Sequence, residues 1–174
     1  MKTIILFLVF LLSAIIGYGQ KAKYFGPLKR PDEQVIFSFR LKNSNKTAML
    51  CRQKNNRYLV YRFGTQGNIE LKYPAILTAA SWKEFKYDGY TRGGGRENSA
   101  EVENSVTFIN NGIRYKIYED WASIYNEKGD CGIMAEINGR KKQLNGNIHS
   151  EIGTLGSLDD YEALIPNSYW DDNQ

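Results

Sequence analysis

The segment Arg92-Gly93-Gly94-Gly95-Arg96 is the most distinctive run of chemistry-bearing residues in the sequence. Consecutive glycines expose backbone N–H groups and permit a positive φ, so such a segment can approach a ligand closely. The two flanking guanidinium groups can bind carboxylates or phosphates through paired hydrogen bonds. The spacing is not that of a phosphate-binding P-loop. We interpret the segment as a loop that binds an acidic partner, with a flexible solvated turn as the structural alternative.

The run Asn111-Gly112-Ile113-Arg114-Tyr115 is a second candidate. Asn-Gly between apolar segments is a strong signal of a β-hairpin turn, so the structural interpretation places Arg114 and Tyr115 at the start of the returning strand. The functional hypothesis adds that Gly112, Arg114 and Tyr115 display a guanidinium group on a tight turn. Such a display also suits an acidic partner.

Residues for catalysis or metal binding are sparse. His149 is the sole histidine, and it lacks the Gly-x-Ser-x-Gly context of a serine hydrolase. A metal site needs three or four ligands, which one histidine and two cysteines do not suggest. Paired carboxylates, Glu101 with Glu103 or Glu119 with Asp120, leave glycoside hydrolysis open, although solvated strand-end charges explain them more simply. We predict no catalytic residue, no metal and no cofactor.

The two cysteines, Cys51 and Cys131, predict a disulfide. In an oxidising compartment an isolated pair of cysteines is typically bridged. The bridge would close a loop of about 80 residues and, in the chain-entropy model, stabilise the fold by roughly 4 to 5 kcal/mol. A reactive thiol is the alternative, and titration of free thiols distinguishes the two.

The first 19 residues have the three parts of a secretory signal peptide. Residues 1–3 carry a positive charge, residues 4–16 are apolar apart from one serine, and residues 17–19 place glycines at the cleavage site. The apolar run is shorter than the roughly 20 residues of a membrane span. We therefore predict a signal peptide at 1–19, export to the periplasm or the extracellular space, and no stable membrane span after cleavage.

The remaining composition indicates one domain and argues against nucleic-acid binding. Removing 19 of the 174 residues leaves about 155, enough for a single domain with its own core. The net charge of +4 falls to about +3, because Lys2 leaves with the signal. The other Lys and Arg residues are interleaved with acids and form no basic run. We place a basic arm or linker at 20–32 and one β-rich domain at 33–174.

Alternating apolar and polar residues predict the secondary structure of this domain. Residues 33–41 and 57–63 alternate as half-buried strands do, and 82–90 does so with an aromatic face. Asn110-Asn111-Gly112 joins two further strands in a hairpin. Turn signals recur about every 8 to 12 residues, as in sandwiches and barrels. We predict an all-β fold, an antiparallel β-sandwich or small barrel of about eight strands.

One short helix is expected near the C-terminus. Ser157 can cap the helix, and acids in the next turn, such as Asp159, favour the positive end of the helix dipole. Leu158 and Tyr161 recur at helical spacing. Pro166 ends the pattern.

Residues 51–73 contain Tyr-Leu-Val-Tyr-Arg-Phe-Gly-Thr and Ile-Glu-Leu, and Trp82, Phe85, Tyr90 and the glycine run at 93–95 follow. Together these residues resemble a group of small uncharacterised exported bacterial β-domain proteins. The resemblance covers about half of the chain after the signal. It implies an exported β domain and brings no activity with it.

A second resemblance rests on the cysteines, one on an early strand and one on a late strand, and on the 111–115 run. This layout is similar to that of the C-type lysozyme inhibitors of the bacterial envelope, whose inhibitory segment reads Ser-Gly-x-Arg-Tyr. Asn111 stands in place of the serine, and this chain is longer than those inhibitors. The resemblance implies that Gly112, Arg114 and Tyr115 enter a lysozyme cleft, where two carboxylates suit an arginine.

These observations predict an exported, disulfide-stapled, non-catalytic binding protein of the bacterial envelope. Its expected partner is a protein with an acidic site, such as a hydrolase that it inhibits or a toxin that it neutralises. One alternative is a carboxylate-dependent hydrolase that acts on a glycan or a peptide. The aromatic residues that would stack on a sugar are Trp82, Tyr87, Tyr90 and Trp121. The other alternative is a structural component of the cell surface.

Overall fold

The computed structural model describes residues 28–96, 98–123 and 129–166. The predicted signal peptide at 1–19, and residues 20–27 of the predicted arm, lie outside the described residues. Within the described part of the chain, no helix combines the length and the hydropathy needed to cross a membrane.

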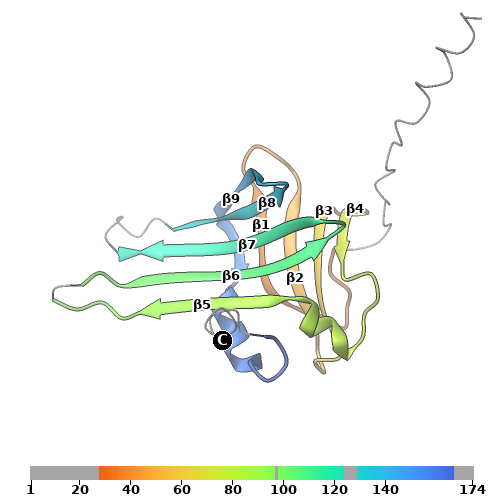
Figure 1. Cartoon of the computed structure of the whole chain (residues 1–174), viewed down its shortest axis with the longest axis horizontal. Coiled ribbons are helices and arrows are strands. Elements are labelled where there is room, and N and C mark those ends of the chain that lie inside the picture. Colours follow the sequence, from red (N-terminus) through yellow and green to blue (C-terminus); the bar gives the residue numbers. More distant parts are fainter. Residues whose placement is uncertain (1–27, 97, 124–128, 167–174) are drawn as a thin grey trace, which may run out of the picture.

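The fold is all-β, as predicted, and its strands form one antiparallel sheet (Figure 1). The strand order is β4-β3-β2-β1-β9-β8-β7-β6-β5, so every pair except β1 with β9 joins neighbours in the sequence. The sheet has nine strands, against the prediction of about eight. They are β1 (Glu33–Leu41), β2 (Thr47–Gln53), β3 (Leu59–Thr65), β4 (Asn68–Tyr73), β5 (Lys86–Arg92), β6 (Glu101–Asn110), β7 (Ile113–Ala122), β8 (Asp130–Ile137) and β9 (Arg140–Gly153).

Asparagines in the left-handed backbone region make the turns between strands. Asn43, Asn56, Asn111 and Asn138 all have a positive φ, between 49° and 59°. Asn111 and Asn138 are each followed by a glycine that also has a positive φ, the arrangement that two-residue hairpins require. The predicted hairpin at Asn110-Asn111-Gly112 is therefore confirmed, and it joins β6 to β7.

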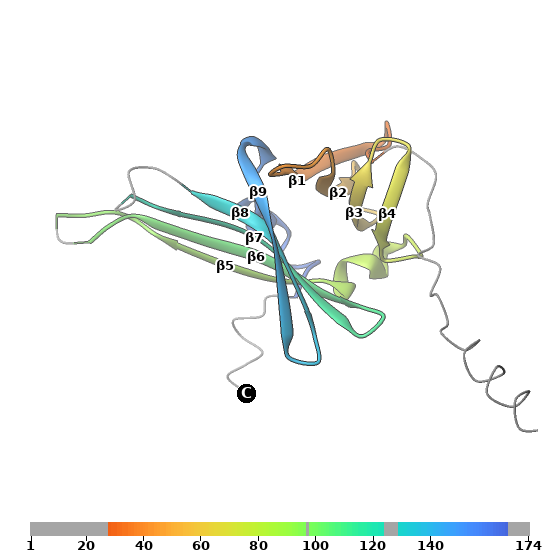
Figure 2. The ribbon, with the colours of Figure 1, turned by 90° about the horizontal axis from the view of Figure 1, so that it is seen from above.

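Strand β9 turns the sheet through a corner. Its first part, from Arg140 to Asn145, pairs with β8, and its second part, from Gly146 to Gly153, pairs with β1. The strands β5 to β8 therefore run across β1 to β4, and the sheet curls into a half barrel (Figure 2). β4 and β5 form its two edges.

Two short 3₁₀ segments, η1 (Ala79–Glu84) and η3 (Leu155–Tyr161), correct two predictions. Trp82 lies in η1 and not at the start of a strand: Ser81 Oγ accepts a hydrogen bond from the Thr78 N–H, and the Trp82 indole donates to the Asn56 carbonyl. The C-terminal helical segment is capped by Thr154, which accepts from the Gly156 N–H, and not by Ser157.

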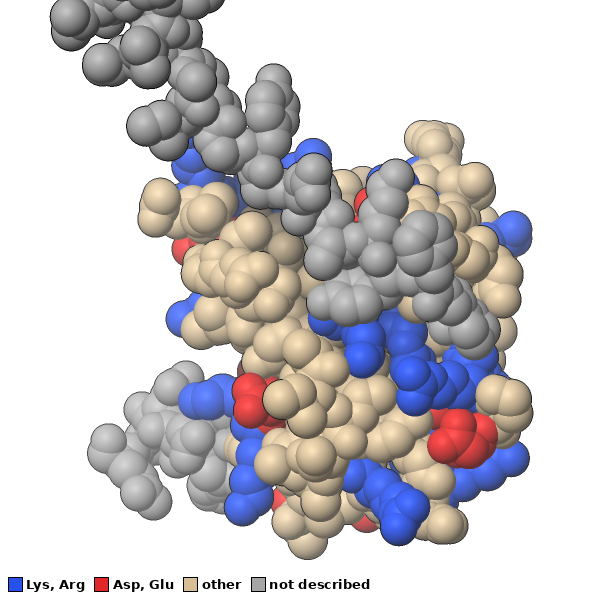
Figure 3. All heavy atoms as spheres, turned by 90° about the vertical axis from the view of Figure 1, so that its right-hand side faces the viewer, with Lys and Arg blue, Asp and Glu red and all other residues tan. Residues whose placement is uncertain are grey.

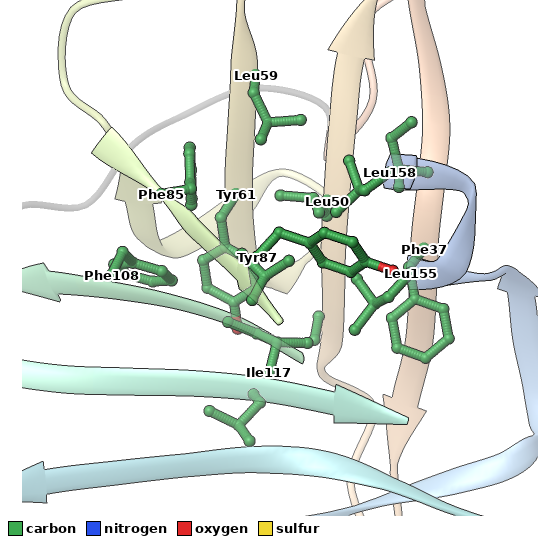
Figure 4. Close-up of a cluster of buried hydrophobic side chains, with 14 of the residues drawn as sticks. Phe37, Leu50, Leu59, Tyr61, Phe85, Tyr87, Phe108, Ile117, Leu155 and Leu158 are labelled. Carbon is green, nitrogen blue, oxygen red and sulfur yellow. The ribbon is translucent and has the colours of Figure 1, made fainter. Parts of the chain in front are cut away.

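The hydrophobic core fills the concave face of the sheet, which we define by Phe37, Leu50, Tyr61, Phe108 and Ile117. Figure 4 shows Tyr61 reaching from β3 toward Phe108 and Ile117 on the opposite strands. The η segments add further buried side chains to this core, namely Trp82, Leu155 and Leu158. Of the predicted apolar stripe of the C-terminal segment, Leu158 is buried and Tyr161 is half-buried against the same core.

A buried ion pair lies on the other, convex face. The Arg62 guanidinium donates two hydrogen bonds of 2.7 Å to the Glu33 carboxylate, and both side chains are at most 2 % exposed. Glu33 also accepts from the Tyr58 hydroxyl and from the Arg30 N–H. Burial alone would raise the pKa of Glu33, but these donors, Arg62 foremost, outweigh it and hold that pKa below its ordinary value.

The predicted disulfide between Cys51 and Cys131 is wrong, because both cysteines are free and buried. Cys51 packs on the convex face with Val60, whereas Cys131 belongs to the core of the concave face. Their strands, β2 and β8, are separated by β1 and β9. Three strand spacings of about 4.8 Å exceed the roughly 7 Å that a disulfide can span between Cα atoms.

Candidate ligand-binding site

A cavity of about 610 Å³ opens on the concave face, in the part that η1 and η3 leave uncovered. This volume lies within the range of small-molecule sites, roughly 300 to 1,000 Å³. Most of its lining is aromatic or aliphatic, and a few polar groups stand among these side chains. The lining residues are Tyr61, Phe63, Glu70, Leu71, Lys72, Tyr73, Ala75, Asn110, Asn111, Ile113, Tyr115, Ile133, Ala135, Lys142 and Leu144.

Strands β3 and β4 form one wall of the cavity. Tyr61 pairs with Tyr73, and Phe63 with Leu71, so two cross-strand pairs of large side chains stand on the same face. The Tyr73 ring stacks on Phe108 of β6, with 4.4 Å between centroids and 15° between planes. This stacking joins the wall to the opposite side of the half barrel.

The other wall is a row of directly paired residues across β6, β7, β8 and β9. Phe108 pairs with Tyr115, Tyr115 with Ala135, and Ala135 with Lys142. Phe108 also stacks on Tyr115, with 5.1 Å between centroids, so it lies between two tyrosine rings. The small Ala135 leaves space between the Tyr115 ring and the Lys142 side chain, and the cavity occupies this space.

Two phenol hydroxyls are the notable polar groups of the cavity. The side chain of Tyr61 is 1 % exposed and that of Tyr115 is half-buried. Desolvation raises the pKa of both, and for Tyr61 the neighbouring Tyr115 adds to the effect. In the described parts of the chain neither hydroxyl has a hydrogen-bond partner, whereas the Tyr73 hydroxyl donates to Glu84. Neither hydroxyl is among the fully enclosed polar atoms, so both are accessible to a ligand in the cavity.

The charged groups around the cavity differ in whether a ligand can bind them. Glu70, the carboxylate of the described lining, forms an ion pair of 2.9 Å with Lys46, whose ammonium lies 5.7 Å from the Phe63 ring centroid. Lys142 is exposed and projects from the cavity face of β9. Figure 3 shows that Lys and Arg side chains outnumber acids on the side of the molecule that carries β3 and β4. The surroundings of the cavity therefore favour an anion.

The predicted Arg92–Arg96 loop lies far from this cavity, at the end of the β5–β6 hairpin that projects away from β1 to β4 (Figure 1). Arg92 pairs in register with Glu101 and forms an ion pair of 2.7 Å with it. Its guanidinium also donates to the Ser99 carbonyl. Gly93, Gly94 and Gly95 are exposed, as is Arg96. Arg92 thus stabilises its own hairpin, and Arg96 is the more available arginine.

The second predicted segment lies at the other end of β6. At about 3.3 Å per residue, the ten residues of β6 separate it from the Arg92–Arg96 loop by roughly 30 Å. Gly112 forms the turn, and Tyr115 lines the cavity. Arg114 is exposed on the opposite face, where it pairs with Glu136 of β8. The structure does not bring the two predicted segments together, and Tyr115 is the member that contributes to the cavity.

A second hollow, of about 260 Å³, is acidic. Glu103, Asp120 and Asp130 are direct neighbours across β6, β7 and β8, and Glu101 and Trp121 also line the hollow. Desolvation, and then the carboxylates of Glu103 and Asp130, raise the pKa of Asp120, which Lys116 partly offsets. No cluster of His, Cys, Asp and Glu with the arrangement of a metal site is found among residues 28–96, 98–123 and 129–166.

Sequence reasoning missed most of the cavity. Tyr61 and Phe63 were predicted as residues of an alternating strand, but alternation does not tell a packed side chain from one that borders a cavity. Ala135 and Lys142 lie in β8 and β9, and neither residue carries a distinguishing signal in the sequence. A usable signal was the abundance of tyrosine, 12 residues in this chain, since a phenol combines an apolar ring with a polar tip.

Comparison with protein-family models, with curated proteins and with solved structures finds no match to this chain.

Proposed function

We propose that this protein is a non-catalytic binding protein that holds a small, largely apolar ligand in the concave cavity. The observation that supports the proposal is the cavity itself, about 610 Å³ with walls of tyrosine, phenylalanine and aliphatic side chains. Sites for small ligands are typically concave and mostly apolar, with a few polar groups that orient the ligand. The cavity has this composition.

The lining favours binding over catalysis. Glu70 is held by Lys46, and the described lining contains no histidine, serine or cysteine that could act as a nucleophile or base. The two buried thiols are elsewhere, Cys51 on the convex face and Cys131 inside the core. The proposal retains the expected export to the periplasm or the extracellular space, which N-terminal sequencing of the secreted protein tests.

Titration with the fluorescent probe anilinonaphthalene sulfonate (ANS) tests the proposal. We expect saturable binding by the folded protein, and we expect Ala135→Phe to abolish it, because a ring at this position fills the space between Tyr115 and Lys142. Met134→Phe is the matched control: it adds a similar ring to the same strand on the opposite face and should leave ANS binding unchanged. Equal binding by both variants would place the probe elsewhere and contradict the proposal.

A protein partner with an acidic site remains a second proposal, and it concerns the Arg92–Arg96 loop. The observation in its favour is the exposed Arg96 at the end of a projecting hairpin (Figure 2). Affinity capture from the cell envelope tests this proposal. Arg96→Ala should lose the partner, and Arg92→Ala should weaken capture through the loss of its ion pair with Glu101. Capture that is indifferent to both changes would contradict it.

The hydrolase alternative has one observation in its favour, the raised pKa of Asp120 beside Glu103 and Trp121. A general acid with a raised pKa near a second carboxylate is the arrangement of glycoside hydrolases. Release of reducing ends from bacterial glycans, abolished by Asp120→Asn, would support this alternative. Activity that Asp120→Asn leaves intact would contradict it.

A further inference from the structure

We infer that the ligand of the concave cavity is an amphiphile with one apolar body and one carboxylate, and that the Tyr61 and Tyr115 hydroxyls bind the carboxylate. This inference rests on the proposed binding function and specifies the chemistry of the ligand. It follows from the position of the two hydroxyls, from the charges that surround them and from the apolar walls.

The Tyr61 hydroxyl is placed as a binding group. Its ring is packed by Phe108, with 5.2 Å between centroids, and the residue is 1 % exposed, so the side chain is held in one position. Its hydroxyl has no partner in the described structure, although the residue lines the cavity. The hydroxyl is not among the fully enclosed polar atoms, so a ligand in the cavity can reach it.

Tyr115 brings a second hydroxyl to the same region from the opposite wall. Its ring stacks on Phe108, the same ring that packs against Tyr61, so the two tyrosines share one neighbour. Both tyrosines line the same cavity, so their two phenols can meet the two oxygens of one carboxylate. The space beside Ala135 admits this group, and Lys142 lies directly across Ala135 in the next strand.

The two hydroxyls act as donors. Desolvation raises the pKa of both phenols, so both keep their protons at neutral pH. A protonated phenol without a partner offers its O–H first, and the strongest acceptor for it is an anionic oxygen. The matching part of the ligand is therefore an acceptor, and a carboxylate matches it better than an ammonium group does.

The charged side chains near the two hydroxyls also favour a negatively charged group on the ligand. Lys142 offers an ammonium group on the cavity face, and Glu70 is already neutralised by Lys46. An ammonium group of a ligand would meet Lys142 without an available carboxylate in the described lining. The remaining walls, Phe63, Leu71 and Ile133 among them, suit a hydrocarbon body.

Competition with bound ANS tests the inference with three chains of equal length, dodecanoate, dodecanol and dodecylamine, all far below their micellar concentrations. We expect dodecanoate to displace ANS at least tenfold more strongly than dodecylamine, with dodecanol between them. Tyr61→Phe should weaken the binding of dodecanoate about tenfold, since a hydrogen bond to a charged group contributes about that much to affinity. Tyr90→Phe removes an exposed hydroxyl outside the cavity lining and should change nothing.

A second pair of variants separates charge from structure. Lys142→Met should weaken the binding of dodecanoate and leave the binding of dodecanol unchanged. Lys141 lies one position along β9 and on the other face, so Lys141→Met should change the binding of neither. Circular dichroism and thermal unfolding show whether each variant is folded. If Tyr61→Phe does not fold, Tyr115→Phe and Lys142→Met decide the question.

The outcomes separate the inference from the proposed function. Equal displacement by the three chains, or normal dodecanoate binding by folded Tyr61→Phe, Tyr115→Phe and Lys142→Met variants, would overturn the inference and leave the apolar binding site standing. Preference for dodecylamine would also overturn it. Failure of ANS itself to bind the cavity would contradict both the inference and the proposed function.

Discussion

Tyr61 combines two roles in one residue, because its ring is part of the core while its hydroxyl borders the cavity. Residue type alone does not indicate which side chains are buried, since Glu33 and Arg62 are charged yet at most 2 % exposed. No local pattern identifies such residues, because the partners that make burial tolerable come from distant strands.

The Glu33–Arg62 pair predicts a specific loss of stability in acid. The pKa of Glu33 lies below its ordinary 4.5 in the folded protein, so the stabilisation is complete above about pH 4.5 and is lost as the pH falls through the lower native value. Glu33→Gln should cost about 3 to 5 kcal/mol near pH 7, because it leaves Arg62 buried without a counter-charge. Urea unfolding from about pH 7 to about pH 3 measures both proteins.

The difference between wild type and Glu33→Gln should shrink as the pH falls, since the wild-type carboxylate becomes protonated. A difference that stays constant over this range would contradict the assignment. If the variant does not fold, Tyr58→Phe, which removes one donor to Glu33, provides the milder comparison.

The free cysteines predict slow thiol chemistry. Burial raises the pKa of Cys51 to about 12, and burial together with a hydrogen bond to Glu151 also raises the pKa of Cys131. The thiolate is the reactive form, so a thiol reagent should label the native protein slowly and find two thiols in the denatured protein. If the denatured, unreduced protein contained no reactive thiol, the two cysteines would be bridged and the prediction would be contradicted.

At the scale of elements, β9 decides the shape of the sheet. Gly146 stands where its pairing passes from β8 to β1, and a side chain at this position would collide with Cys131 and with the Phe39 ring, which a Cβ would approach to 2.6 Å. Alternation of apolar and polar residues does not continue through this glycine. The corner, and the seven residues of β9 that follow it, have no such pattern in the sequence.

Gly146→Ala should destabilise the protein by about 1 to 3 kcal/mol, because the added methyl group overpacks the corner of the half barrel. Gly95→Ala is the control, since a Cβ there meets nothing within 4 Å, and it should change stability by less than about 0.5 kcal/mol. Chemical denaturation of both variants checks this. A neutral Gly146→Ala would show that the corner tolerates a side chain.

At the scale of the whole molecule, the all-β class and most strand positions could be predicted, because period-two alternation and Asn-Gly turns are local signals. The half barrel could not, since it depends on the pairing of β1 with β9 across the length of the domain. The cavity arises where β3 and β4 face β7 to β9, and its residues are far apart in sequence. The Arg92–Arg96 loop is recognisable in the sequence because its residues are contiguous, whereas the residues of the cavity are not.

The central claim is that a ligand binds within the concave cavity. Amide chemical-shift mapping during an ANS titration measures the location of binding residue by residue. The largest changes should fall on Tyr61, Tyr115, Ala135 and Leu144, with little change at Gly93 to Arg96. Changes confined to that loop or to the hollow around Asp120, or no saturable change at all, would contradict the claim.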